Sequence, residues 1–385
     1  MQGITLLLPS GLSIMAIVVL VPILPLLLAH FKTLPGAEYR VPMLLTIPAA
    51  CLVFMSPVAG WIADRVPRRR VLLIAMTLYA FIGMLPLVLN DYAGILASRV
   101  ALGCVEAVVL TVSTTLVGDF FTGAARDRWL GYQIGVASLF ATSLIWVGGA
   151  LSAYGWRGPF AVYATALLMM AAVAKFTWEP DRVERVADDM RWAAFPWRRM
   201  SGFCTLTLFG SILFYFVLIQ LPILFLKFGL GPSATSGFWL AVVGLGITSG
   251  TLVFGQIAPI GPRKILIAAF TLLGIGFWAM HSATSLEMLI VAATVNQFGA
   301  GLLMPTLLTW STRDLPPFFR GSGTGLWQGT FSMGQFLMPL LVTFIARNVG
   351  GLNVATSIFA GCAGALALGF AAFELRTRGG SQHPK

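Results

Sequence analysis

The segment Gly60-Trp-Ile-Ala-Asp-Arg-Val-Pro-Arg-Arg69 recurs as Gly255-Gln-Ile-Ala-Pro-Ile-Gly-Pro-Arg-Lys264, with Gly, Ile, Ala, Pro and two basic residues at equivalent positions. The two copies are offset by 195 positions, and the same offset relates Asp119 to Asp314. Each of these aspartates is followed by a short loop that contains an arginine. A repeat at one constant offset predicts that the chain consists of two copies of one structural unit.

The composition indicates that lipid is the solvent for most of the chain. Of the 385 residues, 58% are hydrophobic and only 10% are charged. A water-soluble protein of this size needs more polar surface. Inside a bilayer only helices and closed barrels satisfy their own backbone hydrogen bonds. Because the apolar runs are long and continuous, without the short alternating segments of a barrel, the sequence predicts an all-α membrane protein.

Twelve apolar segments have the length of a transmembrane helix, about 20 residues. Six precede the midpoint of the chain and six follow it, which agrees with the repeat. The expected spans are 4–29, 41–63, 71–90, 92–118, 130–153, 158–177, 201–226, 235–258, 265–283, 286–310, 322–346 and 350–375.

The lysines and arginines predict the orientation. Of the 25 basic residues, nineteen fall in loops on one side, five on the other, and Arg99 lies within a span. Cytoplasmic loops carry the excess of basic residues. We therefore expect a multi-pass protein of the bacterial inner membrane with both termini in the cytoplasm. The first span is expected to act as an uncleaved targeting signal.

The polar stretch between spans six and seven separates the two halves. It carries charges of both signs, together with Pro180 and Pro196. We therefore predict an N-terminal six-helix bundle over 1–178, a cytoplasmic linker over 179–200 and a C-terminal six-helix bundle over 201–385.

Several functional classes are excluded by the pattern of charged and reactive residues. The net charge of +11 does not indicate nucleic-acid binding, because the basic residues lie between apolar spans. The four cysteines have no spacing or histidine neighbours that indicate a metal site. No phosphate-binding glycine-rich loop and no His-Cys-carboxylate cluster is present. We therefore expect neither an enzyme nor a cofactor.

The segment that begins at Gly60 resembles the signature loop between spans two and three of the major facilitator superfamily. The resemblance covers essentially the whole chain, although the family usually has glycine where this chain has Pro67. It implies a transporter of two six-helix bundles, in which Gly60 allows close helix approach, Asp64 pairs with a helix end and the arginines hold a cytoplasmic gate. The gating residues expected on this basis are Gly60, Asp64, Arg65, Arg68, Arg69, Asp119 and Arg126.

Span four contains the most informative residue, Glu106, which is the one acidic residue expected deep inside a span. Such a group is costly in lipid unless it faces a cavity or a partner. Arg99 lies seven positions earlier, so both fall within about 20° of one helix face and roughly 10 Å apart along the axis. Gly103 lies between them, and we expect it to leave room for water or substrate. Two interpretations follow, a proton-coupling site and a static buried ion pair.

The segment Ala97-Ser98-Arg99 with Gly103, Glu106 and Asp119 also resembles span four of proton-coupled drug antiporters and of Spinster-type transporters. In the proton-coupled antiporters the resemblance implies that the arginine is tied to proton transfer. Spinster-type transporters usually carry an acidic residue in span one, which this chain lacks. Drug exporters usually carry Gly-Pro four residues before a Gly-Gly pair in span five. Here Gly148-Gly149 is present, but Leu144-Ile145 occupies the Gly-Pro position.

Neutral polar side chains within the spans are candidates for solute binding. They either line a central cavity or form hydrogen bonds between helices. The residues selected for solute binding are Tyr132, Gln133, Gln220, Asn296 and Gln328.

Taken together, these features predict a secondary transporter for small amphipathic or hydrophobic solutes. It is expected to work by alternating access, with proton-coupled efflux favoured. The alternative is an uncoupled or uptake facilitator for a lipid or an organic acid. The partners expected are the solute, protons and membrane lipids, and we expect a monomer.

Overall fold

The structure is a computed structural model of the chain. It describes residues 2–121, 123–179, 195–313, 315 and 317–379. Within these residues the chain is helical apart from its connections, and no strand is present. The all-α prediction is therefore confirmed.

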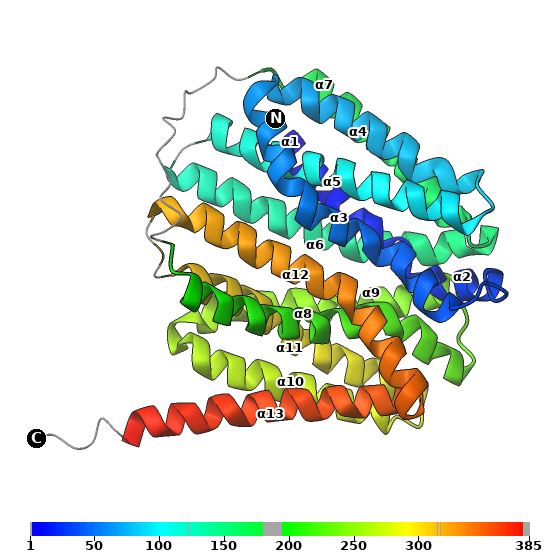
Figure 1. The fold of residues 1–385 in the computed structure, drawn as a ribbon, viewed down its shortest axis with the longest axis vertical. Helices are drawn as coiled ribbons and strands as arrows, with labels where there is room; N and C mark the ends of the chain where they lie inside the picture. The colour runs from blue at the N-terminus through cyan, green and yellow to red at the C-terminus, as the bar shows by residue number, and fades with distance from the viewer. Residues whose placement is uncertain (1, 122, 180–194, 314, 316, 380–385) are drawn as a thin grey trace, which may run out of the picture. The chain divides into compact units, whose positions relative to one another are not determined.

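The chain divides into two compact units (Figure 1), each described here by itself. Unit 1 comprises Met1–Ala194 and Gly231–Phe238, and unit 2 comprises Phe195–Leu230 and Trp239–Lys385. Most of the predicted linker, residues 180–194, lies outside the described residues.

Unit 1 is a bundle in which α5 packs against α1, α3 and α4, and α6 packs against α1. The helices of this unit are α1 (Gln2–Val18), η1 (Val21–Ile23), α2 (Leu24–His30), α3 (Ala37–Arg65), α4 (Arg68–Met84), η2 (Leu85–Leu87), α5 (Tyr92–Phe120), α6 (Gly123–Leu151), η3 (Ser152–Tyr154), η4 (Gly158–Ala164) and α7 (Thr165–Phe176).

Unit 2 is a second bundle, in which α10 packs against α11 and α13, and α8 packs against α11 and α12. Its helices are α8 (Trp197–Phe225), η6 (Leu226–Phe228), the greater part of α9 (Ala234–Ile257), η7 (Ala258–Ile260), α10 (Pro262–His281), α11 (Leu286–Thr312), α12 (Pro317–Ile345), η8 (Ala346–Gly350) and α13 (Leu352–Gly379).

The lengths of the helices agree with the predicted spans. Eleven segments within the described residues are long and apolar enough to cross a membrane. The remaining predicted span corresponds to α6, whose apolar stretch in the described part of the chain is the shorter segment Leu139–Tyr154. Span one is interrupted where α1 gives way to η1 and α2, at Pro22 and Pro25, because proline cannot donate the helical hydrogen bond.

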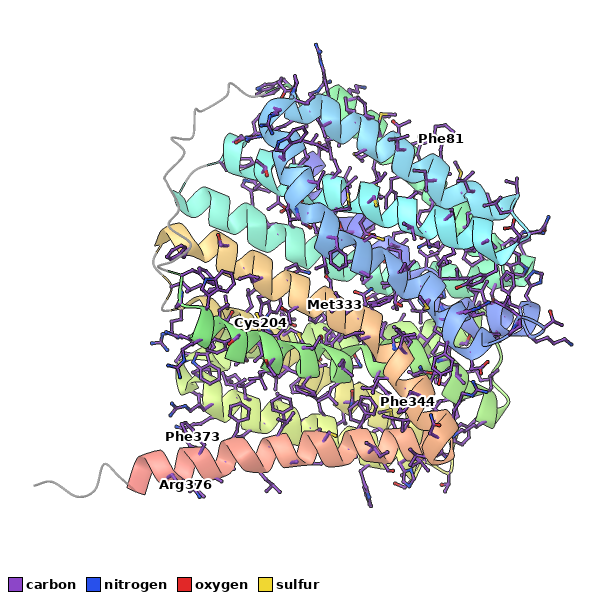
Figure 2. The ribbon with its side chains drawn as sticks, viewed as in Figure 1. Phe81, Cys204, Met333, Phe344, Phe373 and Arg376 are labelled. Carbon is purple, nitrogen blue, oxygen red and sulfur yellow. The ribbon has the colours of Figure 1, made fainter. Side chains whose placement is uncertain are left out.

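The outer faces of the helices carry large apolar side chains, as a lipid environment requires. Phe81 on α4, Phe344 on α12 and Phe373 on α13 are 56%, 57% and 51% exposed (Figure 2). In water such a surface would be unfavourable, so it indicates contact with hydrocarbon.

The Gly148-Gly149 pair of α6 is explained by close helix packing inside unit 1. A Cβ atom at Gly148 would lie 2.4 Å from the carbonyl oxygen of Val19, just after α1. A Cβ atom at Gly149 would lie 2.5 Å from Cα of Gly237, at the start of α9. Both positions therefore require glycine, and Gly237 belongs to the segment Gly231–Phe238 of unit 1.

Candidate functional site

Helix α5 carries Arg99 and Glu106 into the interior of unit 1. The helix begins after Asp91, whose side chain accepts a 2.6 Å hydrogen bond from the backbone N–H of Gly94 and so caps the first turn. Arg99 is fully buried and Glu106 is 4% exposed. Two ionisable side chains are thus removed from the surface at neighbouring levels of one helix.

The guanidinium group of Arg99 is satisfied by three oxygen atoms from three other elements. Nη2 donates to the carbonyl oxygen of Ala16 in α1 at 2.6 Å, and Nε donates to that of Leu44 in α3 at 3.2 Å. Nη1 donates to the phenol oxygen of Tyr163 in η4 at 3.0 Å. Hydrogen bonds to a charged donor are among the stronger ones, so Arg99 connects α5 to α1, α3 and η4.

The two carbonyl oxygens are free to accept because of local breaks in helical hydrogen bonding. Leu44 lies four residues before Pro48, which has no N–H to donate to it. Ala16 lies in the last turn of α1, and the N–H of Leu20 donates to Ile17 instead. Helix ends leave such carbonyl oxygens without helical partners. Pro48 and the end of α1 therefore create the binding site for Arg99.

Two tyrosines complete the surroundings of Arg99. Its guanidinium carbon lies 5.4 Å from the ring centre of Tyr163, a distance at which a cation is attracted to an aromatic face. The ring of Tyr79 lies 5.6 Å from that of Tyr163, and the Tyr79 hydroxyl donates to the carbonyl oxygen of Leu12 at 2.6 Å. Sequence reasoning missed both residues, because tyrosine in an apolar span has no distinctive pattern.

Glu106 differs from Arg99 in its hydrogen bonding. Its Oε2 atom is buried and has no hydrogen-bond partner among the described residues. No ion pair joins Glu106 to Arg99 in the part of the chain that the structure describes. The static ion pair between Arg99 and Glu106, one of the two interpretations of the sequence, is therefore not formed in this structure.

Gly103 does not leave the room for water or substrate that we expected. A Cβ atom there would lie 2.6 Å from Cα and 2.7 Å from the carbonyl oxygen of Pro48. Helix α3 occupies this space, so the role of Gly103 is close packing of α5 on α3. The expectation was wrong because a glycine that opens a cavity and one that admits a neighbouring helix look alike in sequence.

The loop between α3 and α4 brings several predicted gating residues together. Arg68 Nη1 lies 2.5 Å from Asp119 Oδ2 at the end of α5, and Arg68 Nε donates to the carbonyl oxygen of Ala63. The Arg69 side chain donates to the carbonyl oxygen of Ala174 at 2.6 Å. The guanidinium group of Arg65 lies over the Trp61 ring. The side chains of Asp64 and Arg126 lie outside the described residues.

The family resemblance implied a close helix approach at Gly60, and the described residues do not show one. A Cβ atom at this position would meet no described atom within 4 Å. Its packing therefore differs from that of Gly103, although both glycines were singled out by sequence patterns.

The five predicted solute-binding residues divide between the units. In unit 1, Tyr132 is 55% exposed, whereas Gln133 is buried and donates to the carbonyl oxygen of Leu6 in α1 at 3.3 Å. In unit 2, Asn296 is fully buried and its Nδ2 donates to the carbonyl oxygen of Leu273 in α10 at 3.0 Å, while its Oδ1 has no described partner. Gln133 and Asn296 therefore form the hydrogen bonds between helices that were the alternative interpretation.

The remaining two predicted residues also belong to unit 2. Gln220 is buried in α8, 3% exposed, and Gln328 is partly buried in α12. Next to Asn296, Gln297 was not among the selected residues, yet it lines a cavity with Val217 and Leu221 of α8.

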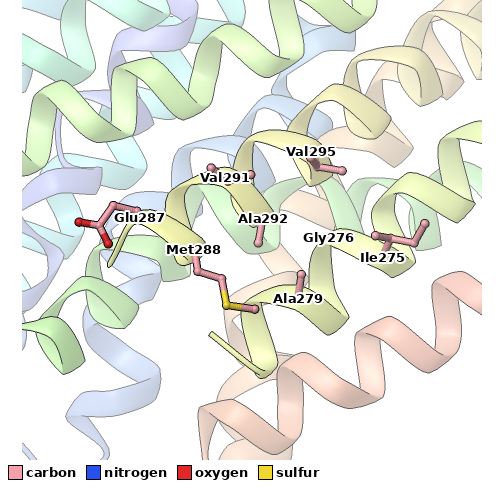
Figure 3. Close-up of a pocket in the computed structure, with 8 residues that line it drawn as sticks. All are labelled: Ile275, Gly276, Ala279, Glu287, Met288, Val291, Ala292 and Val295. Carbon is pink, nitrogen blue, oxygen red and sulfur yellow. The ribbon is translucent and has the colours of Figure 1, made fainter. Parts of the chain in front are cut away.

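A larger cavity of about 330 Å³ lies between α10 and α11 (Figure 3). Its lining is apolar except for Glu287, whose carboxylate lies at the edge of the group. Two of its lining residues, Ile275 of α10 and Val291 of α11, are 54% and 63% exposed. This cavity is therefore an open groove on the apolar outer surface of the helices.

The helical architecture agrees with comparisons to known proteins. The family model described as Major Facilitator Superfamily matches residues 6–260 and 203–385. The chain belongs to the major facilitator superfamily. The two overlapping matches cover nearly all of the sequence, so the resemblance noted at Gly60 is confirmed.

Curated relatives in this superfamily are transporters. The chain is 24% identical over 337 residues to the 3-(3-hydroxyphenyl)propionate transporter of Escherichia coli, covering 83% of this chain and 81% of the relative. It is 25% identical over 352 residues to the class D tetracycline resistance protein of Salmonella ordonez, covering 87% and 86%. The superfamily member described here is therefore a multi-pass secondary transporter.

The fold is also that of solved facilitators. A bacterial homologue of the human lysosomal transporter Spinster, in an inward-facing and occupied conformation, superposes with a TM-score of 0.78 at 16% identity, with 96% of each chain covered. This likeness establishes the fold.

Proposed function

We propose that this facilitator couples the export of a small amphipathic or hydrophobic solute to proton entry by alternating access. The observation that carries the proposal is the buried Oε2 atom of Glu106, which has no described hydrogen-bond partner. An ionised carboxylate in such a place is unfavourable, because nothing replaces its hydration. A proton is the smallest partner that removes this cost.

The arrangement of Arg99 supports a titrating role for Glu106. The guanidinium group already has three oxygen acceptors, from Ala16, Leu44 and Tyr163. It therefore adds a positive charge near the carboxylate without forming a fixed ion pair. A proton bound in one state of the transport cycle and released in the other would bias that cycle, because a ligand shifts only states that bind it with different affinity.

The relatives support the class of solute. Their names refer to an aromatic acid and to a tetracycline, and both are small molecules with an apolar frame and polar groups. The spans carry few charged side chains and many apolar ones. Such a composition suits these solutes better than sugars or multiply charged anions.

The direction of transport is proposed as efflux. A tetracycline resistance protein among the relatives favours export, although Leu144-Ile145 replaces the Gly-Pro pair that drug exporters usually carry before Gly148-Gly149. The aromatic-acid transporter keeps a second possibility open, namely uptake or uncoupled transport of an organic acid or a lipid. We further propose the bacterial inner membrane with cytoplasmic termini, on the basis of the lysine and arginine distribution. A monomer is expected as well.

Flux into proteoliposomes, with and without an imposed pH gradient, tests the proposal. Radiolabelled tetracycline and 3-(3-hydroxyphenyl)propionate are the first probe solutes. Glu106→Gln keeps the shape of the side chain and removes its charge, so it should abolish gradient-driven flux while solute binding and exchange persist. Glu287→Gln, which changes an exposed carboxylate on α11, is the matched control and should transport normally.

Two results would decide against proton coupling at Glu106. Unaltered gradient-driven flux in the Glu106→Gln protein would remove this residue from the mechanism. If flux through the unmodified protein does not depend on the pH gradient, the result would instead favour the uncoupled facilitator.

A further inference from the structure

Unit 2 contains a small cavity that the proposed proton-coupling site does not use. Its volume is about 20 Å³, and it lies among α8, α9 and α11. The walls include Val217, Leu221, Leu240 and Val243, all of them buried. The only polar side chain among its lining residues is Gln297.

The amide group of Gln297 is buried without partners. The side chain is 1% exposed, and neither Oε1 nor Nε2 forms a hydrogen bond with any described residue. Buried polar atoms in native proteins are almost always paired. The neighbouring Asn296 follows that rule at its Nδ2 atom, which donates to Leu273. Gln297 therefore presents a free donor and a free acceptor to an otherwise apolar cavity.

The size and chemistry of the cavity define the group that it can accept. A cavity needs ~10–15 Å³ to hold one water molecule, so about 20 Å³ admits a single polar heavy atom. That atom has to donate to Oε1 and accept from Nε2, as a hydroxyl group does. A charged group does not fit, because no opposite charge lines the cavity.

We propose that this cavity binds the hydroxyl group of an apolar alcohol or phenol, with Gln297 donating one hydrogen bond and accepting another. Because the cavity holds one heavy atom, the hydrocarbon part would lie outside it, against the half-buried lining residues Leu218, Gly244 and Ile247 of α8 and α9. As a solute site the proposal rests on the transport function above, and it narrows the solute class to hydroxylated apolar molecules. Binding itself can be measured without transport.

Gly244 provides a way to block the cavity without touching Gln297. It lines the cavity, and a Cβ atom there would meet no described atom within 4 Å. Gly244→Val should therefore fill the space while the backbone stays in place. Gly361→Val on α13 is the matched control, because Gly361 is exposed, helical and equally free of close neighbours.

Thermal unfolding of the purified full chain in one detergent measures the binding, with 4-ethylphenol and ethylbenzene as probes. A ligand of the folded state raises the unfolding temperature according to its concentration and Kd. The unmodified protein and Gly361→Val should bind 4-ethylphenol about tenfold more tightly than ethylbenzene, as two hydrogen bonds allow. Gln297→Met should lose this preference, and Gly244→Val should bind neither probe.

Equal stabilisation by the two probes, or a hydroxyl preference that survives in Gln297→Met, would overturn the proposal. So would binding of 4-ethylphenol that Gly244→Val leaves unchanged. If neither probe binds the unmodified protein, the cavity holds a structural water only and the proposal is wrong. These results do not depend on Glu106. The binding experiment could contradict the hydroxyl site while proton-driven flux still requires Glu106. In that case the hydroxyl site would be wrong and the transport proposal would stand.

Discussion

Arg99 donates a 3.2 Å hydrogen bond from Nε to the carbonyl oxygen of Leu44, the residue four positions before Pro48. The proline that interrupts hydrogen bonding in α3 thus provides an acceptor for a buried cation on α5. The buried guanidinium group of Arg99 and the carbonyl oxygen of Leu44 satisfy each other. Without this hydrogen bond each of them would lack a partner at that position.

This relationship predicts that Arg99 and Pro48 are energetically coupled. Arg99→Met removes the donors to three oxygen atoms and should lower the free energy of unfolding by about 2–5 kcal/mol. Pro48→Ala supplies an N–H to Leu44, so in that background the loss should be smaller by about 1 kcal/mol. A double-mutant cycle on unfolding in detergent measures the coupling.

The control for this cycle is Pro57→Ala, which changes another proline inside α3. It restores a helical N–H without affecting Leu44, so it should show no coupling to Arg99→Met. Additive losses for Arg99→Met and Pro48→Ala would show that the Leu44 bond contributes nothing.

A second prediction contrasts two glycines of unit 1. Gly103→Ala would place a methyl group within 3 Å of the backbone of Pro48, so it should destabilise the fold by about 1–3 kcal/mol or more, as overpacking does. Gly60→Ala meets no described atom within 4 Å and should be neutral, or stabilising by up to about 1 kcal/mol through helix propensity. The measurement compares the unfolding temperatures of the Gly103→Ala and Gly60→Ala proteins in one detergent. Equal changes in unfolding temperature would refute the close contact between Gly103 and Pro48.

A third prediction concerns the ion pair between Arg68 and Asp119, whose side chains are only 15% and 10% exposed. Asp119→Asn should leave the protein folded in the membrane and slow solute flux about tenfold, which corresponds to roughly 1.4 kcal/mol. Asp64→Asn and Arg65→Ala should likewise slow transport. Reversing the pair, with Arg68→Asp and Asp119→Arg together, should restore part of the flux.

The control for these variants is Asp91→Asn at the start of α5, where asparagine caps a helix as well as aspartate does. Its flux should equal that of the unmodified protein. If the Asp119, Asp64 and Arg65 variants all transport at that same rate, the basic loop only fixes topology.

A fourth prediction concerns orientation, which follows from the nineteen-to-five distribution of basic residues. Reporter tags fused at Met1 and at Lys385 should both be cytoplasmic, and a tag in the connection before Ala37 should be external. Protease protection in inverted and right-side-out vesicles reports the location of each tag. A periplasmic C-terminus would require an odd number of spans.

The fold could be predicted because its signals are local and repeated along the chain. Each span is an apolar run of sufficient length, and the repeat at Gly60 and Gly255 identifies the two halves without any knowledge of contacts. Span one was predicted as one segment, whereas α1 gives way to η1 and α2 at Pro22 and Pro25, because proline cannot donate the helical hydrogen bond.

The site could be predicted only in part. The seven-residue spacing placed Arg99 and Glu106 on one face, but the partners of Arg99 are main-chain oxygens, which no side-chain pattern marks. Pro48 leaves the carbonyl of Leu44 without a helical donor, but whether that carbonyl meets Arg99 depends on where α5 packs. Asn296 and Gln297 differ by about 100° around one helix, and only packing shows which of them faces the cavity.

The main-chain acceptors of Arg99 have a consequence for how this sequence can diverge. Any residue at positions 16 and 44 supplies the same carbonyl oxygen, so selection on the Arg99 contact places no demand on the side chains there. The demand falls on Arg99, on Pro48 and on the phenol of Tyr163. Among descendants of this gene, Ala16 and Leu44 should drift freely among apolar residues, while arginine and proline are retained or lost together.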